Sequence, residues 1–153
     1  MAAGNVTLYS KNKNVLKLSD LTGATVKLLL TTSSYTPDAT VTGNSVLTDI
    51  SNELANANGY TTGGIALSSM SVTSITGGYK FTSANPVWTA SGGSIPAWRN
   101  GVLYVSGSLW SLTSPLIGYF VGDTTSGGTD IPATTSGNTL TITVPSGGWF
   151  DET

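Results

Sequence analysis

Histidine and cysteine are both absent from the 153-residue chain. Without cysteine, the chain can form no disulfide and no thiolate zinc site. Without histidine, it lacks the side chain that titrates nearest to neutral pH and that most often serves as a general base or a metal ligand. These absences exclude much of the common catalytic chemistry. We therefore expect a protein that is not an enzyme and that uses no cofactor and no metal.

Charged side chains are also scarce. They make up 9% of the chain, against roughly 25% in an average globular domain. The six cations are scattered and the formal net charge is −2, so we expect no basic patch and no nucleic-acid partner. Abundant glycine, serine and threonine predict a neutral, hydroxyl-rich surface that repels its neighbours weakly. Such a surface suits a component of an assembly, and it suits a secreted domain equally well.

Long apolar runs are missing as well. The longest, such as residues 28–30, are only a few residues long, whereas a membrane-spanning helix needs about 20. The first ten residues lack the basic start and the apolar stretch of a signal peptide. We therefore expect no membrane partner.

Short segments with alternating apolar and polar residues are present along most of the chain. In residues 24–32, Val26, Leu28 and Leu30 share one face of a predicted strand, and residues 140–144 alternate in the same way. Turn signals separate seven to nine such strands. The pattern predicts an all-β fold built as a single β-sandwich, for which a jelly roll is one candidate topology. The expected sandwich domain covers residues 14–145.

One short helix is expected over residues 45–55. Val46, Leu47, Ile50 and Leu54 fall at helical spacing in this segment. The Asn-Gly pair that follows at 58–59 is a typical helix stop. We expect a helix of one to three turns.

The two ends of the chain are interpreted as extended arms, an N-terminal arm at 1–13 and a C-terminal tail at 146–153. The N-terminal arm has a short alternating stretch, and the tail carries two large aromatic residues directly after a Gly-Gly pair, where a place in the core is difficult to arrange. We expect both arms to contact a partner. The candidate contact residues are Val6, Leu8, Tyr9, Trp149 and Phe150.

The remaining tryptophans divide into core and surface candidates. Trp88 is the best candidate for a core anchor, whereas Trp98 and Trp110 flank a predicted strand close to loops. Exposed aromatic side chains act as anchors in protein interfaces or as platforms for glycans, so Trp98 and Trp110 are further candidate partner-binding residues. The sequence contains no motif that supports a catalytic pair of carboxylates, a serine–lysine nucleophile or a calcium loop.

Two segments resemble a family of small structural proteins of tailed bacteriophages. Residues 28–38, LLLTTSSYTPD, are similar to the family's L-x-T-S-S-Y-T-P-D segment, and residues 52–64, NELANANGYTTGG, are similar to its N-E-V-…-G-Y-T-x-G-G segment. Weaker similarities at 102–104 and 115–119 follow in the same order, so the resemblance covers roughly residues 16–144. The chain departs from the family at 91–99, a neutral loop where the family is more acidic.

The resemblance implies a head decoration (cement) protein, made in the cytoplasm of the host bacterium and located on the capsid surface of the virion. Its implied partner is the major capsid protein, whose neighbouring copies it would bridge so that the assembled head is stabilised. A homo-oligomer is expected as well, with a trimer at local three-fold positions as its form. The alternative is a module of the tail or fibre that binds a receptor or a glycan.

Overall fold

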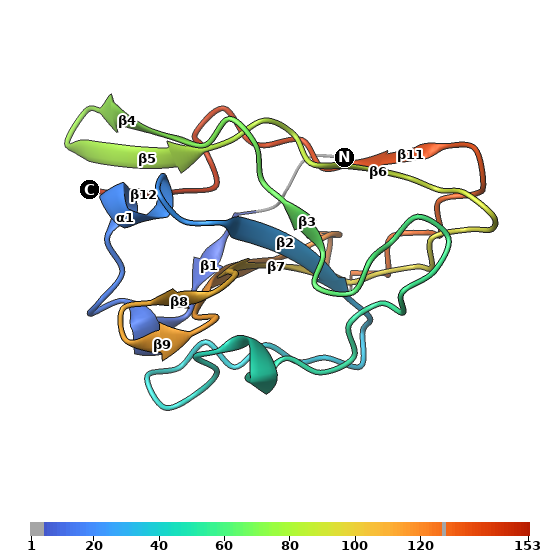
Figure 1. Ribbon diagram of the computed structural model, residues 1–153, viewed down its shortest axis with the longest axis horizontal. Coiled ribbons are helices and arrows are strands. Elements are labelled where there is room, and N and C mark those ends of the chain that lie inside the picture. The colour runs from blue at the N-terminus through green and yellow to red at the C-terminus, as the bar shows by residue number, and fades with distance from the viewer. Residues whose placement is uncertain (1–4, 127) are drawn as a thin grey trace.

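The structure, a computed structural model, describes residues 5–126 and 128–153. It is mostly β, with several antiparallel sheets, one short α-helix and no barrel, which confirms the predicted fold class (Figure 1). The largest sheet has five strands in the order β1-β10-β7-β2-β3, and every neighbouring pair is antiparallel. These strands are β1 (Thr7–Leu8), β10 (Leu116–Val121), β7 (Asn100–Val105), β2 (Val26–Thr31) and β3 (Ile65–Ala66).

Three smaller sheets surround this central sheet. One has the order β12-β5-β4, a second pairs β11 with β6, and a third is the hairpin of β8 and β9. Their bounds are β4 (Ser71–Ile75), β5 (Gly78–Thr82), β6 (Val87–Thr89), β8 (Ser108–Leu109), β9 (Leu112–Thr113), β11 (Thr139–Thr141) and β12 (Phe150–Glu152).

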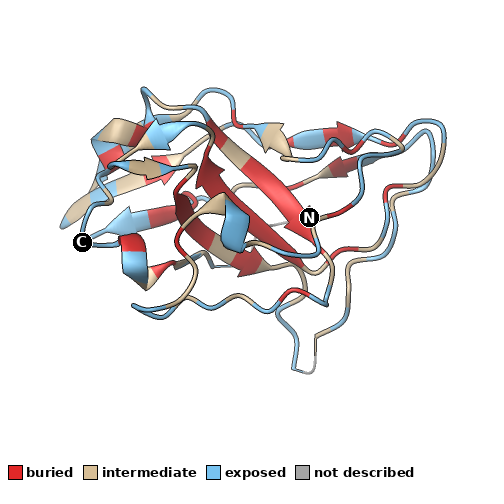
Figure 2. Cartoon of the chain, turned by 60° about the horizontal axis from the view of Figure 1, so that its bottom comes forward, coloured by how far each residue is buried: buried red, intermediate tan, exposed pale blue. Residues whose placement is uncertain are grey.

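Both faces of the central sheet are buried, and Figure 2 shows the buried residues concentrated on its long strands. As predicted, Val26, Leu28 and Leu30 of β2 share one face, because side chains alternate along a strand. This face packs in the main hydrophobic cluster with residues of β5, β6, β11 and β12, which is the packing of a sandwich. Leu29 faces the opposite side, where it packs with Tyr35 in a second cluster.

The segment between β2 and β3 supplies the cover for that second face. It contains the turn η2 (Leu47–Asp49), a single turn of 3-10 helix, and its Leu47 and Ile50 pack against the second cluster. The helix expected over 45–55 is therefore absent, and this expectation was wrong. After η2 the chain is extended, so that the Leu54 amide donates to the Leu30 carbonyl (3.0 Å) beside β2.

The physical reason is that the apolar residues of 45–55 serve two different cores. Leu47 and Ile50 face the second cluster, whereas Leu54 belongs to the main cluster, and one helix face cannot reach both. The Asp49 carboxylate accepts from the amides of Ser45 (2.7 Å) and Val46 (3.1 Å) and so stabilises a single turn. The short α-helix lies instead at α1 (Leu18–Leu21), which buries Leu18 and Leu21. A further 3-10 turn, η1 (Ser10–Asn12), precedes it.

The described parts of the two terminal segments are strands of the fold, which corrects their interpretation as extended arms beside the core. In the N-terminal arm, Thr7 pairs with Tyr119, and Tyr9 is fully buried; residues 1–4 lie outside the described residues. In the C-terminal tail, Phe150 pairs with Phe81. Gly148 makes the turn before it with φ +83°, where a Cβ would lie 2.5 Å from the Phe81 carbonyl oxygen, and so brings the tail back onto the core.

Candidate interaction site

The first and last described strands border a groove. β1 is an edge strand of the central sheet and β12 is an edge strand of the three-stranded sheet. Between them lies a cavity of about 560 Å³, lined by 5–8 on one wall and by residues of 145–151 on the other. A second cavity of about 490 Å³ shares Leu8, Lys13 and Asp151 with the first and continues it. We call the two together the terminal groove.

The backbone of β1 directs one residue into this groove. The Tyr9 amide donates to the Ile117 carbonyl (3.1 Å), so Tyr9 directs its backbone groups toward the neighbouring strand. Residues of an antiparallel strand alternate between those that pair with a given neighbour and those that point away from it. Leu8, which is opposite Gly118, therefore directs its N–H and C=O away from β10, at the free edge of a strand that lines the groove.

The same reasoning places Asp151 on the opposite wall. The β4–β5 hairpin closes at the pair Ile75 and Gly78 across a two-residue turn, so these two residues exchange backbone hydrogen bonds. Because the direction alternates along the strand, the backbone groups of Phe81, three residues later, point away from β4 and toward β12. The Phe81 carbonyl accordingly accepts from the Trp149 amide (2.8 Å). Phe150 and Glu152 pair with Phe81 and Tyr79, and Asp151 between them directs its backbone groups away from β5.

The side chains of the terminal groove combine an apolar base with a charged rim. Val6 and Leu8 are half-buried and pack against the main cluster, which also contains Trp149 and Phe150. One ammonium group, that of Lys13, and two carboxylates, those of Asp151 and Glu152, line the groove. The rim therefore has an excess of negative charge.

Four of the residues expected to bind a partner thus meet at one place, but two of them are walls and not free anchors. Trp149 is stacked on Phe120 with ring centroids 5.9 Å apart, and its Nε1 donates to Ser83 Oγ (2.9 Å). Phe150 packs on Phe81 with centroids 5.6 Å apart. The Gly-Gly turn before them makes possible the core position that the sequence alone did not suggest.

Tyr9 lies apart from the groove, in the second cluster. Its hydroxyl is 2.8 Å from that of Tyr35. Burial, followed by this hydrogen bond, raises the pKa of Tyr9 well above its ordinary value. Tyr9 is therefore a buried structural residue, and its interpretation as an exposed contact residue is corrected.

Trp98 is likewise buried and not an exposed platform. It exchanges backbone hydrogen bonds with Ile131 and packs edge-to-face on Phe120, with centroids 6.2 Å apart. Gly122 leaves room for the ring, because a Cβ there would lie 3.0 Å from two of its atoms. Since Trp98 is inaccessible, it offers no surface to a glycan or a protein, and the interpretation of Trp98 as a contact residue is corrected.

Trp110 is half-buried at the turn of the β8–β9 hairpin. It has φ +53° and the following Ser111 has φ +61°, as a two-residue type I′ turn requires. The indole Nε1 donates to Asp20 Oδ2 (3.0 Å) and so ties the hairpin to α1.

The segment that resembles the phage family at 52–64 closes the open side of β2. Glu53 Oε1 accepts from the Tyr60 hydroxyl (2.8 Å) and from the Gly63 amide (2.6 Å), while the Tyr60 hydroxyl accepts from the Leu30 amide (3.0 Å). The Tyr104 hydroxyl donates to the Gly63 carbonyl (2.7 Å). Burial, and then the nearby Glu53 carboxylate, raise the pKa of Tyr104 to about 12. This motif therefore serves the fold.

Two buried polar side chains that the sequence analysis did not single out hold neighbouring segments together, and the first of them supports the other resembling segment, 28–38. Asn100 Nδ2 donates to Thr31 Oγ1 (3.2 Å) and to the Tyr35 carbonyl (3.3 Å). Asn12 Nδ2 donates to the carbonyls of Ser45 (2.6 Å) and Leu116 (2.8 Å). Asn12 lies in a polar stretch and Asn100 in an Asn-Gly pair that is typical of a turn, so no local pattern marks either side chain as buried.

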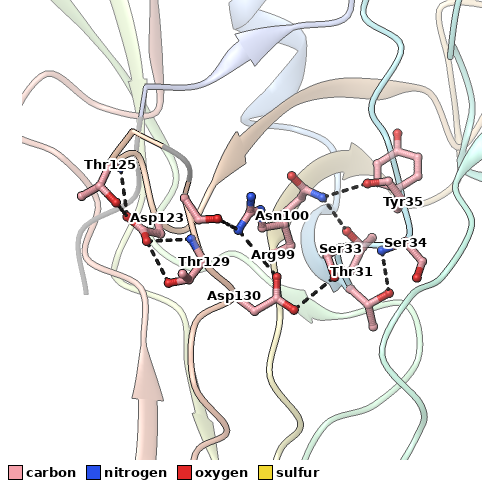
Figure 3. Close-up of polar contacts among 12 residues, drawn as sticks. Thr31, Ser33, Ser34, Tyr35, Arg99, Asn100, Asp123, Thr125, Thr129 and Asp130 are labelled. Atoms are coloured by element: carbon pink, nitrogen blue, oxygen red, sulfur yellow. Dashed lines mark hydrogen bonds and ion pairs between the residues drawn. The ribbon is translucent and has the colours of Figure 1, made fainter.

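A polar network connects three loops near the end of β2 (Figure 3). Arg99 Nη1 donates to the Gly128 carbonyl (2.5 Å) and lies 3.7 Å from an oxygen of Asp130, whose other carboxylate oxygen accepts from Ser33 Oγ (3.1 Å). These contacts join 99–100 to 128–130 and to the turn after β2. They hold loops together and leave no carboxylate oxygen of Asp130 without a neighbour.

Asp123 forms the second part of that network. Its carboxylate accepts from the amides and hydroxyls of Thr125 and Thr129, at 2.8 to 3.0 Å. These donors, the backbone amides first, lower the pKa of Asp123 well below its usual range. Within residues 5–126 and 128–153, no group of three or more acidic side chains is arranged to hold a metal ion. No helix in the same residues is long and apolar enough to cross a membrane.

Comparison with known proteins gives no match to a protein-family model, to a curated protein or to a solved structure.

Proposed function

We propose that this chain is a bacteriophage head decoration protein, which binds the outer surface of the assembled capsid and bridges neighbouring copies of the major capsid protein. The observation that supports this proposal is the terminal groove. Both ends of the chain contribute an edge strand to it, and the two edges face one space. An edge strand presents unpaired backbone groups that readily pair with another chain, so the groove is suited to a protein partner.

The neutral surface and the sequence resemblance favour a partner within a virion. Low net charge permits dense packing of many copies on a lattice. Both segments similar to the phage family support β2. The Tyr60 hydroxyl accepts from the Leu30 amide and donates to Glu53, and Tyr35 packs in one cluster with Leu29. The resemblance therefore covers parts of the scaffold that holds the central sheet.

The mechanism follows from mass action. A protein that binds the assembled shell and not the free subunits stabilises the shell by RT ln(1 + [L]/Kd), which is about 2.7 kcal/mol per site when its free concentration is a hundredfold above Kd. Binding to two neighbouring subunits adds avidity. Oligomerisation, with a trimer at local three-fold positions as the proposed form, would multiply the attachments in the same way.

The test uses expanded empty heads that lack this protein, assembled from the major capsid protein of the same phage. Purified protein is mixed with the heads, and its co-sedimentation and the melting temperature of the shell are measured. The proposal predicts saturable binding and a raised melting temperature. Absence of binding, with unchanged shell melting, contradicts it. Unexpanded precursor heads serve as the control for shell maturation.

A further inference from the structure

The proposed function leaves open how the protein attaches to its partner, and the terminal groove restricts the answer. We infer that an extended segment of the major capsid protein enters the terminal groove as an added strand and pairs with β1 on one side and β12 on the other. This inference rests on the proposed function. It assigns the docking site and the conformation of the partner's segment.

The backbone geometry selects an extended strand as the occupant. Leu8 directs its N–H and C=O away from β10, and Asp151 directs its own away from β5, as the pairings of their neighbours require, and both residues line the groove. A strand has alternating donors and acceptors on both of its edges, so it can satisfy both walls at once. A helix has no free backbone groups along its length and satisfies neither.

Side chains specify the chemistry of the added strand. On its inward face, an apolar side chain would rest on Val6 and Leu8, which continue into the main cluster. On the rim, two carboxylates and one ammonium group leave an excess of negative charge. The segment that fits therefore alternates apolar and polar residues and carries at least one lysine or arginine facing Asp151 and Glu152.

One substitution separates the backbone contact from the side-chain contact. Asp151→Pro removes the amide that points into the groove, and an edge strand tolerates proline where its N–H is not used within the sheet. Asp151→Ala removes the carboxylate and keeps the amide, and so is the matched control. With the expanded heads, we expect Asp151→Pro to weaken binding by at least about tenfold, or about 1.4 kcal/mol. Asp151→Ala should weaken binding by only about threefold, the loss expected for one exposed ion pair with the cationic side chain of the added strand, so the difference between the two variants measures the backbone contact.

Hydrogen exchange of the unmodified protein gives a second measurement that needs no variant to fold. Peptides covering 5–9 and 149–152 should both exchange more slowly on expanded heads than in free protein. If the protein binds the heads but neither segment is protected, the inference is overturned and the proposed function stands. The same conclusion follows if both variants and the unmodified protein bind the heads equally. Protection of these segments in concentrated free protein would identify a second copy as the occupant, which also overturns it. Failure of the unmodified protein to bind heads overturns both.

Discussion

Replacing Trp149 by alanine should destabilise the whole domain, because the C-terminal segment is part of the core. The indole is 2% exposed, stacks on Phe120 and donates to Ser83. Truncation of a buried tryptophan costs about 3–5 kcal/mol. The lost hydrogen bond adds little, because Ser83 is half-buried and water can replace the donor. This cost is a large part of the 5–15 kcal/mol that stabilises a typical domain.

The assay is urea unfolding followed by far-UV circular dichroism, together with a thermal scan. At about 2–4 °C per kcal/mol for a chain of this size, the melting temperature should fall by about 6–20 °C. Trp149→Phe keeps a ring against Phe120 and should lose only about 1–2 kcal/mol. Glu152→Ala, in the same segment but exposed, should change stability by less than about 0.5 kcal/mol. If Trp149→Ala unfolds within 1 kcal/mol of the unmodified protein (about the error of the comparison), the segment is a free tail and the reasoning is refuted.

Three further predictions concern backbone fit and titration. Gly64→Ala should lower the free energy of unfolding by more than about 2 kcal/mol, because Gly64 has φ +71° and a Cβ there would lie 2.0 Å from the Leu28 carbonyl oxygen. Gly77→Ala should cost only about 1–2 kcal/mol, because Gly77 has φ +89° but nothing lies within 4 Å of its Cβ position. Equal losses of the two variants in urea unfolding would contradict the close approach at Gly64. The pKa of Tyr104 is raised to about 12 from 10.0, so this tyrosine ionises at lower pH in the unfolded chain than in the folded one. Stability should therefore decline as pH rises above about 10, and it should decline less steeply in Tyr104→Phe. An identical alkaline decline in the two proteins would count against this prediction. The lowered pKa of Asp123 gives stability that is present above the ordinary carboxyl pKa of about 3.9 and is lost as pH falls below it. The melting temperature of Asp123→Asn should therefore depend less on acid pH than that of the unmodified protein. An unaltered pH dependence would refute the assignment.

The parts of the fold that could be predicted from the sequence depend on local alternation. The inward positions of β2 were identified correctly because a strand buried against one layer repeats every second residue. The terminal strands were not identified as parts of the core. Their partners, such as Tyr119 for Thr7 and Phe81 for Phe150, lie far away along the chain, and no local pattern encodes such a pairing.

The wrong helix has a related cause. Leu47, Ile50 and Leu54 match the spacing of one helix face, but the structure distributes them between two clusters on opposite faces of the central sheet. Spacing alone cannot distinguish one continuous face from two separate contacts. The Asp49 carboxylate, which accepts from two amides of the preceding segment, fits a turn as well as it fits the polar side of a helix.

Four of the candidate partner-binding residues lie together in the structure, and their role in binding stays a prediction. Val6, Leu8, Trp149 and Phe150 were selected for their place near the ends of the chain, and the structure gathers them around the terminal groove. Lys13 and Asp151 were missed, because a single charged residue in a short terminal segment carries no signal of its own. Trp98 and Trp110 were selected for their proximity to loops, but the first is buried beside Phe120 and the second anchors a hairpin to Asp20.

The most direct test of the central proposal is a cryo-electron microscopy map of the virion whose genome encodes this chain. The proposal predicts copies of the domain on the outer surface of the head, at junctions between capsomers, with β1 and β12 turned toward the shell. A map in which the domain is found only on the tail or its fibres, or sits on the head with the terminal groove open to solvent, would contradict it.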